Sequence, residues 1–361
     1  MRLAMLTTRA TVQGPLPKLT PLLADALRGH GCEVELMQCW GRRVEGQRLP
    51  AKLWERAADV RAVTKDVVRG GFPLVVVHTS HDWLTLARDL ALLRSLPRDV
   101  IRVLQFHGSQ SSRLVAPGSS AFKRATSELV SQANGVFLLS REEQAEWKTF
   151  RPELRLFVVR NPMPAPPLPD FANDLGDDGL PIVLSVARLI PDKGGADLVR
   201  ALPHVQAEAP CRLRLVGAGP EENRLRALAV ELGVETSVEL PGYLEKGDLA
   251  NAYNRAAVFA LPTSHKEGFP LSILEAMAAG LPVVTTRSRG PADHLIEGRN
   301  ALFVPAGDQS GLAAALVRLL HDADLRREMG AANREKVRDF DPDAVAREYL
   351  AALEEVVAAS A

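Results

Sequence analysis

Cysteine is scarce in this sequence, and so are long hydrophobic runs. Only three cysteines occur among 361 residues, which excludes a disulfide framework and a cysteine-rich zinc site and indicates a reducing compartment. The longest apolar runs fall far short of the roughly 20 residues that cross a bilayer. The first ten residues are too polar for a signal peptide. We therefore expect a cytoplasmic protein.

Neither sign of charge is in excess. The sequence has 44 Lys and Arg residues together and 44 Asp and Glu residues together. The net charge therefore gives no sign of a nucleic-acid partner. The two halves differ, however: residues 1–160 carry 24 basic and 15 acidic side chains, and residues 161–361 carry 20 and 29. A basic N-terminal half suits an anionic acceptor, or peripheral contact with the anionic inner face of a membrane. Two solvated domains of different surface composition explain the counts equally well.

Twelve short apolar, β-branched runs alternate with helical stretches. They lie at residues 2–6, 33–37, 74–78, 102–106, 135–139, 156–160, 182–186, 212–216, 237–240, 258–261, 282–286 and 301–304. Such runs, each followed by a helix, predict parallel strands that are buried on both faces. Helical patterns also cover 309–321, 324–338 and 342–360.

The fold class predicted from this alternation is α/β, with two Rossmann-like doubly wound domains that face each other across a cleft. We expect an N-terminal domain over 1–164, a proline-rich linker over 165–181 and a C-terminal domain over 182–341. Proline density rules out a regular element in the linker. A C-terminal helix is expected over 342–361.

A phosphate-binding pattern directly follows the run at 182–186. Arg188 and Lys193 stand in a short loop that ends in two glycines and leads into a helix. Arginine offers a planar fork, lysine a compact charge, and glycine allows close backbone approach to an anion. A surface Arg and Lys beside an ordinary turn is the alternative.

A second loop, at the end of the run 258–261, contains Glu267 and leads into a helix that begins near Pro270 and carries Glu275. The start of a helix offers free N–H groups and a positive dipole end to a phosphate. A carboxylate accepts two sugar hydroxyls at once. These two acids therefore predict a ligand that has sugar on both sides of a phosphate.

Three further features follow predicted strands. Gly217 and Gly219 open like a dinucleotide fingerprint, but Glu222 stands where the third glycine belongs, which makes NAD binding a distant alternative. We expect Pro220 to begin the next helix. His107 follows the run 102–106, where it could bind a sugar hydroxyl or act as a base. Gly14 follows the first strand, where an ordinary turn is the simpler interpretation.

The C-terminal half resembles glycosyltransferase family 4, the retaining glycosyl transferases group 1 with the GT-B fold. The likeness rests on Glu267 and Glu275, on Arg188 and Lys193, on the Leu-Val-Gly-Ala-Gly-Pro turn and on the segment 291–305, where Asp293 replaces the usual Glu. It extends over about 182–308. The N-terminal half is similar in outline only, through His107-Gly108 and Arg160-Asn161-Pro162, and has Gly14-Pro15 where the family has two glycines.

This resemblance implies a role for each matched residue. Arg188 and Lys193 would neutralise the donor diphosphate, Glu275 would bind the ribose, and Glu267 would hold sugar hydroxyls. His107 would lie beside the anomeric carbon. The remaining donor contacts would come from Gly14, Gly217, Gly219, Gly268, Phe269 and Leu271. Pro270 replaces a common glycine and lacks an N–H.

The implied activity is transfer of a sugar from a nucleotide-sugar, with a UDP-sugar as first candidate, to a hydroxyl of a glycan, glycolipid or small-molecule acceptor, as in cell-envelope polysaccharide synthesis. No cofactor and no metal are expected, since no histidine pair has the spacing of a zinc site. The C-terminal helix would cross back to the N-terminal domain. The alternatives are an epimerase or hydrolase of nucleotide-sugars and a non-catalytic binding subunit.

Overall fold

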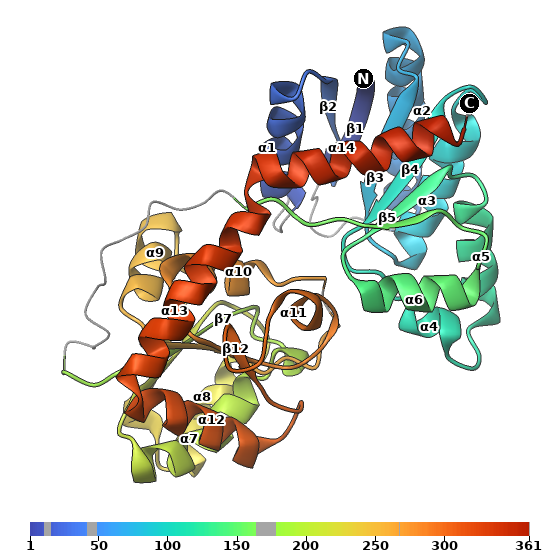
Figure 1. The fold of residues 1–361 in the computed structure, drawn as a ribbon. Helices are drawn as coiled ribbons and strands as arrows, with labels where there is room; N and C mark the ends of the chain where they lie inside the picture. Colours follow the sequence, from blue (N-terminus) through green and yellow to red (C-terminus); the bar gives the residue numbers. More distant parts are fainter. Residues whose placement is uncertain (11–15, 42–48, 164–177, 267, 361) are drawn as a thin grey trace. The chain divides into compact units, whose positions relative to one another are not determined.

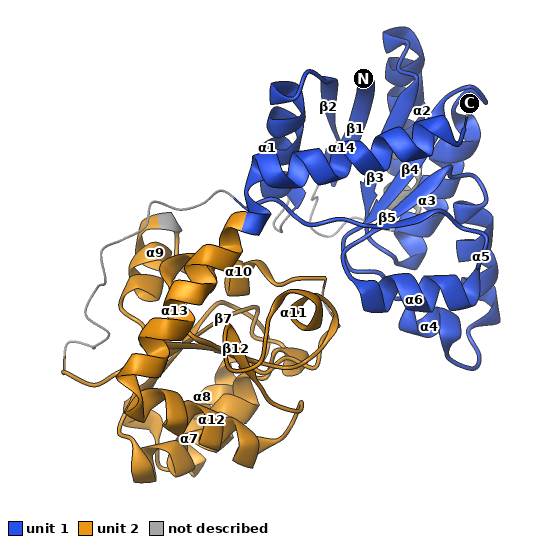
Figure 2. Ribbon diagram, in the orientation of Figure 1, with its two compact units in different colours: residues 1–164, 339–361 blue, residues 165–338 orange. Residues whose placement is uncertain are grey.

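The computed structural model of the protein describes residues 1–10, 16–41, 49–163, 178–266 and 268–360 (Figure 1). The chain forms two compact units, one of residues 1–164 with 339–361 and the other of residues 165–338 (Figure 2). Each unit is described by itself.

The first unit contains a six-stranded sheet in the order β2-β1-β3-β4-β5-β6, and all its described strand pairs are parallel. The strands are β1 (Arg2–Thr8), β2 (Glu33–Trp40), β3 (Leu74–Thr79), β4 (Ile101–Phe106), β5 (Gly135–Leu138) and β6 (Leu156–Val158). The helices are α1 (Leu16–Gly29), α2 (Leu49–Gly70), α3 (Trp83–Ser95), α4 (Ser112–Val115), α5 (Ser120–Val130), α6 (Arg141–Phe150) and α14 (Pro342–Ala358).

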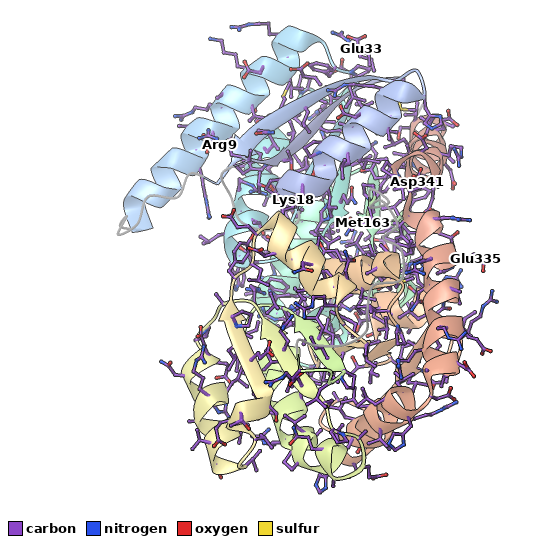
Figure 3. The ribbon with its side chains drawn as sticks, turned by 90° about the vertical axis from the view of Figure 1, so that its left-hand side faces the viewer. Arg9, Lys18, Glu33, Met163, Glu335 and Asp341 are labelled. Atoms are coloured by element: carbon purple, nitrogen blue, oxygen red, sulfur yellow. The ribbon has the colours of Figure 1, made fainter. Side chains whose placement is uncertain are left out.

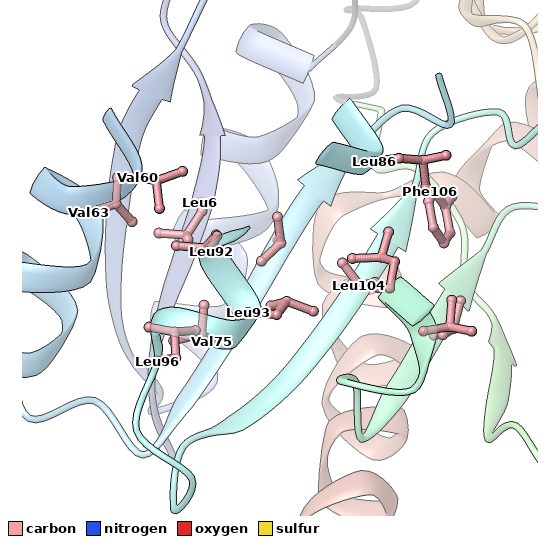
Figure 4. Close-up of a cluster of buried hydrophobic side chains, with 14 of the residues drawn as sticks. Leu6, Val60, Val63, Val75, Leu86, Leu92, Leu93, Leu96, Leu104 and Phe106 are labelled. Carbon is pink, nitrogen blue, oxygen red and sulfur yellow. The ribbon is translucent and has the colours of Figure 1, made fainter. Parts of the chain in front are cut away.

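Alternate side chains of this sheet enter two separate cores. Ala4 and Leu6 of β1 pack among residues of α2, α3 and α5, a cluster of which Figure 4 shows a part. Leu3 and Met5 point to the other face, where they meet residues of α1 and α14. A strand that is buried on both faces of the sheet needs apolar side chains at successive positions. These runs are therefore continuously apolar and do not alternate between apolar and polar residues.

Helix α14 closes the second face of the sheet (Figure 1). The Tyr349 hydroxyl donates to Gln105 Oε1 at 2.7 Å, and its ring meets Phe137 edge-on at 5.0 Å. Before this helix, the Phe340 carbonyl accepts from the Met163 N–H at 2.7 Å, so the chain after β6 lies beside the chain that leads into α14 (Figure 3). The first unit is therefore completed by the last part of the chain.

The second unit has the sheet order β12-β11-β10-β7-β8-β9, and its described strand pairs are also parallel. The strands are β7 (Ile182–Val186), β8 (Arg212–Val216), β9 (Val238–Gly242), β10 (Val258–Leu261), β11 (Val283–Thr285) and β12 (Ala301–Phe303). The helices are α7 (Gly195–Glu208), α8 (Glu222–Glu231), α9 (Lys246–Asn254), α10 (Leu271–Ala279), α11 (Arg289–His294), α12 (Gln309–His321) and α13 (Ala323–Val337).

All twelve predicted strands are present, and the predicted pair of parallel α/β sheets is confirmed. One expected boundary is wrong: α8 begins at Glu222, and Pro220 lies in the turn before it. The Glu221 N–H donates to the Leu189 carbonyl at 3.0 Å, which ties this turn to the loop after β7 instead of to the helix. That bond joins distant parts of the chain and has no local sequence signal.

Candidate functional site

The second sheet has one point at which its strand order reverses. From β7 the chain runs outward through β8 and β9, and it later returns on the other side of β7 with β10, β11 and β12. The loops after the neighbouring strands β7 and β10 therefore leave the same edge in opposite directions. Ligands of open parallel sheets bind at such a point.

Backbone hydrogen bonds hold these two loops together. The Asp192 carbonyl accepts from the Thr263 hydroxyl at 2.8 Å, from the Ser264 N–H at 2.9 Å and from the His265 N–H at 3.2 Å. Asp192 belongs to the short helix η1 (Pro191–Lys193), which follows the Arg188 turn. The predicted phosphate loop and the loop that leads to α10 thus form one connected structure.

Arg188 and Lys193 bring two positive charges to this structure. The Arg188 side chain is exposed, whereas Lys193 is only 9% exposed. Burial first, and then repulsion from Arg188, lower the pKa of Lys193 to about 8, although Asp192 partly offsets them. A lysine kept in such surroundings favours an anion as its ligand.

Two more basic residues, which the sequence analysis missed, belong to the same cluster. Arg289, at the start of α11, is 1% exposed, and its Nη1 donates to the Lys266 carbonyl at 3.3 Å. Its backbone has a φ of 39°, which is unusual for a residue with a side chain. The pKa of His265 is lowered by burial first and then by repulsion from Lys193, Arg188 and Arg289. Each had looked like an ordinary loop residue, because only tertiary contacts show its surroundings.

The predicted glycines after β8 lie against the loop after β7. A Cβ on Gly217, whose φ is +142°, would stand 1.9 Å from the Ala187 carbonyl oxygen. A Cβ on Gly219 would stand 2.2 Å from the Leu189 carbonyl oxygen. The Leu189 N–H in turn donates to the Ala218 carbonyl at 3.0 Å. Both glycines therefore allow the close backbone approach that shapes the Arg188 turn.

Helix α10 carries Glu275, which is half-buried and receives a hydrogen bond from another helix. The hydroxyl of Tyr253, on α9, donates to Glu275 Oε2 at 2.7 Å. Burial and this carboxylate raise the pKa of Tyr253 well above its usual value, so the phenol stays a donor. This hydrogen bond orients the carboxylate.

The segment before α10 contains several predicted contacts. Gly268 and Phe269 are buried and Leu271 is half-buried, whereas Glu267 lies outside the described residues. A Cβ on Gly290, in α11, would stand 1.5 Å from the Gly268 carbonyl oxygen. The start of α11 therefore supports the backbone whose N–H groups the sequence analysis assigned to the sugar.

In the first unit, His107 follows β4 and pairs with a second histidine. His78 Nδ1 lies 3.0 Å from His107 Nε2, a hydrogen bond that neighbouring strands β3 and β4 bring about. Burial lowers the pKa of His107 to about 3. Burial, together with repulsion from His107, lowers the pKa of His78 well below its ordinary value. Both rings are therefore neutral at physiological pH. Gly14 lies outside the described residues.

Across the described ranges, no group of three or more His, Cys, Asp and Glu could hold a metal ion. In the same part of the chain, no helix is long and apolar enough to cross a membrane.

Comparisons with known proteins assign the family. The family model of glycosyl transferases group 1 matches residues 170–336. Glycogen synthase of Mycobacterium tuberculosis (strain H37Rv) is 33% identical over 289 residues, which are 77% of this chain and 69% of that protein. The chain belongs to the glycosyl transferases group 1 family.

One further relative covers less of the chain, and a solved structure covers nearly all of it at lower identity. A GDP-mannose-dependent monoacylated α-(1-6)-phosphatidylinositol monomannoside mannosyltransferase of Corynebacterium glutamicum is 36% identical over 167 residues, 44% of this chain and 43% of that protein. The chain therefore spans less than half the length of some curated relatives. Sucrose-phosphate synthase of Thermosynechococcus elongatus matches with a TM-score of 0.80 and 20% identity over 99% of both chains. This likeness shows the GT-B fold.

The region matched by the glycosyl transferases group 1 model contains the whole candidate site of the second unit. Arg188, Lys193, His265, Glu275 and Arg289 all lie between residues 170 and 336. His78 and His107 lie outside that region. The family therefore bears most directly on the second unit.

Proposed function

We propose that this protein transfers a sugar from a nucleotide-sugar donor to a hydroxyl of an acceptor, with retention of configuration at the anomeric carbon. The observation that carries the proposal is the cluster of basic side chains at the reversal point of the second sheet, in a member of the glycosyl transferases group 1 family. Charge of one sign, gathered at the carboxyl edge of parallel strands, suits a diphosphate.

In this mechanism the bond between the anomeric carbon and the diphosphate oxygen breaks, and the nucleoside diphosphate leaves with the electron pair. Arg188 and Lys193 stabilise the departing negative charge and make a metal ion unnecessary. The acceptor hydroxyl forms the new bond from the same face of the sugar and passes its proton to the departing diphosphate oxygen. Two cations with fixed positions need little reorganisation as the charge develops.

The other predicted residues have positioning roles in this proposal. Glu275 binds the ribose and Glu267 holds sugar hydroxyls, together with the backbone at Gly268, Phe269 and Leu271. Gly217 and Gly219 lie beside the nucleotide, because they allow the backbone turn that forms this part of its site. We assign acceptor binding to the first unit, in which Gly14 supplies a donor contact and His107 lies beside the anomeric carbon. Neutral His107 is able to donate or to accept a hydrogen bond at the anomeric centre.

The donor is the first point to test. We start from a UDP-sugar, and the GDP-mannose-dependent relative supports a GDP-sugar as the alternative. Thermal unfolding is measured with UDP, GDP, ADP or dTDP, each in EDTA. We expect one of them to raise the melting temperature, because a ligand at 100 times its Kd stabilises the fold by about 2.7 kcal/mol.

The matched variants are Lys193→Ala, at the site, and Lys148→Ala, an exposed lysine on α6. Lys193→Ala abolishes the shift and Lys148→Ala keeps it. The proposed site is contradicted if none of the four nucleotides raises the melting temperature, or if the rise is equal in both variants. A shift that is lost in EDTA and returns with Mn²⁺ contradicts the metal-free mechanism.

Product analysis separates transfer from its alternatives. Transfer needs donor and acceptor together, whereas an epimerase or hydrolase converts the donor alone. A non-catalytic subunit binds the nucleotide and forms no product with any acceptor. We expect a glycan, a glycolipid or a small molecule as acceptor, consistent with the lipid-linked acceptor in the name of the Corynebacterium relative.

A surface on α2 supports contact with an anionic membrane. Arg61, Lys65 and Arg69 line a groove along α2 together with Val60 and Val68, and Val68 is 53% exposed. Basic side chains around an apolar strip suit anionic headgroups. We expect the protein to sediment with phosphatidylglycerol vesicles and not with phosphatidylcholine vesicles, and the double variant Arg61→Glu/Lys65→Glu to stay in solution with both.

A further inference from the structure

His265 occupies a distinctive place in the basic cluster. It lies in the loop after β10, its side chain is 43% exposed, and its backbone N–H is fixed to the Asp192 carbonyl. The charged groups that face it come from three elements: Lys193 and Asp192 of η1, Arg188 of the loop after β7, and Arg289 of α11. Lys266 follows it in its own loop.

The balance of these groups lowers the pKa of the imidazole in the ligand-free protein. Three cations repel a proton on the ring, and burial adds to their effect. Asp192 opposes them, but its nearest oxygen, Oδ2, lies 4.0 Å from His265 Nδ1, beyond hydrogen-bond distance. An anion bound among Arg188, Lys193 and Arg289 would reverse the sign of the field at the ring.

We propose that His265 takes up one proton from solvent when a nucleoside diphosphate binds, and then donates a hydrogen bond to a phosphate oxygen. The inference rests on the proposed function, because it assumes that the diphosphate binds in the basic cluster. A free nucleoside diphosphate carries more negative charge than the same diphosphate esterified to a sugar. His265 therefore favours the leaving group over the intact donor.

This behaviour fits catalysis of transfer. As the sugar–phosphate bond breaks, negative charge accumulates on the departing phosphate, and a group that gains its proton at that moment binds the transition state better than the donor. Each unit by which the pKa of His265 rises on binding corresponds to about tenfold in affinity. A permanently charged side chain at this position would instead attract donor and product at every pH.

The test is calorimetric measurement of proton uptake at pH 6.5. UDP and GDP are titrated into the protein in two buffers of different ionisation enthalpy, Pipes and imidazole, so that the protons taken up per ligand follow from the difference in heat. Wild type and His265→Asn are compared, because the titration of the nucleotide itself is the same in both and cancels. His204→Asn, an exposed residue of α7, is the matched control.

We expect wild type and His204→Asn to take up more protons than His265→Asn, by up to one per ligand. The affinity advantage of wild type over His265→Asn falls as the pH rises from 5.5 to 8. His265→Lys binds the nucleotide tightly at pH 8. Its affinity advantage over His265→Asn does not increase at lower pH. Equal proton uptake in wild type and His265→Asn overturns the inference, provided that thermal unfolding shows both proteins to be folded. Failure of wild type to bind any of the four nucleotides, ADP and dTDP included, contradicts the proposed function instead.

Discussion

At the scale of single residues, Lys193 links the site to pH. In the free protein its pKa is lowered to about 8, first by burial. A bound diphosphate raises that value, so the complex holds a proton that the free protein loses above pH 8. We expect nucleotide affinity to fall by up to about tenfold per unit above pH 8, where Lys193 of the free protein loses its proton.

Equilibrium binding of the tightest nucleoside diphosphate from pH 7 to 10 measures this dependence. Lys193→Arg should bind with little change over the same range, because an arginine stays charged. A wild-type affinity that remains flat to pH 10 would show that Lys193 does not contact the ligand.

A second residue-scale prediction concerns Tyr253. Its hydroxyl fixes one oxygen of Glu275, and we assign that carboxylate to the ribose. Tyr253→Phe removes the bond, so the carboxylate is less well oriented. A hydrogen bond to a charged group is worth about 1.5–3 kcal/mol. We expect discrimination between the diphosphate and its 2′-deoxy analogue to drop by about tenfold or more.

Competition binding with the ribose and 2′-deoxy forms provides the measurement. Glu275→Gln is the reference variant and should lose discrimination as well. If Glu275→Gln loses it and Tyr253→Phe does not, Tyr253 only fills space. If neither variant loses it, Glu275 is not the ribose ligand.

The contrast between these residues shows what sequence reasoning is able to reach. Arg188, Lys193 and Glu275 were singled out because each stands at the end of a strand or at a fixed place on a helix. His265, Arg289 and Tyr253 were not, since their surroundings depend on segments far away in the chain. Arg289 contacts the loop after β10, and Tyr253 reaches Glu275 from another helix.

At the scale of elements, strand alternation was enough to predict both sheets. Short apolar runs that alternate with helices fit few arrangements other than a parallel sheet with helices on both faces. The start of α8 was misplaced, because the turn at Gly219 and Pro220 is held by the loop after β7. Local propensity favours a helix start at proline, and a long-range backbone bond overrides it here.

The same close approach makes Gly217 a sensitive position. Alanine there would need a strained backbone and would place its Cβ 1.9 Å from the Ala187 carbonyl oxygen. We expect Gly217→Ala to cost well over 1 kcal/mol of stability and to weaken nucleotide binding at least tenfold, because the Arg188 turn must shift. Chemical denaturation and nucleotide titration measure the two effects.

Gly233→Ala is the control that separates backbone strain from the steric clash of the added Cβ. Gly233 also has a positive φ, +67°, but a Cβ there would meet nothing within 4 Å. This control should lose about 1–2 kcal/mol and keep its nucleotide affinity. Equal losses of affinity in both variants would mean that backbone strain alone explains the result.

At the scale of the whole molecule, the chain builds two units with separate cores and returns to the first one at its end. Residues of α14 belong to the core that lines the second face of the first sheet, and none belongs to the described core of the second unit. The sequence pattern indicated a terminal helix, but the sheet face that it covers is defined only by packing.

This arrangement predicts unequal effects of removing residues 342–361. Deletion exposes the partners of Val345, Tyr349, Leu353 and Val356, each 0% exposed in the intact chain. At about 1.5–3 kcal/mol for each large side chain, the loss rivals the 5–15 kcal/mol by which a domain is stable. We expect the first unit to unfold and the second to remain folded and to bind nucleotide.

Limited proteolysis followed by mass spectrometry tests this expectation. In the shortened chain, peptides from residues 1–163 should appear early and residues 178–338 should resist cleavage. Tyr349→Phe is the milder variant: it leaves Gln105 without its buried donor, at a cost of about 1–3 kcal/mol, and should lower the melting temperature without early cleavage. Simultaneous loss of both units on deletion would show that the second unit depends on the first for its stability, and nucleotide binding could then not be assigned to one unit alone.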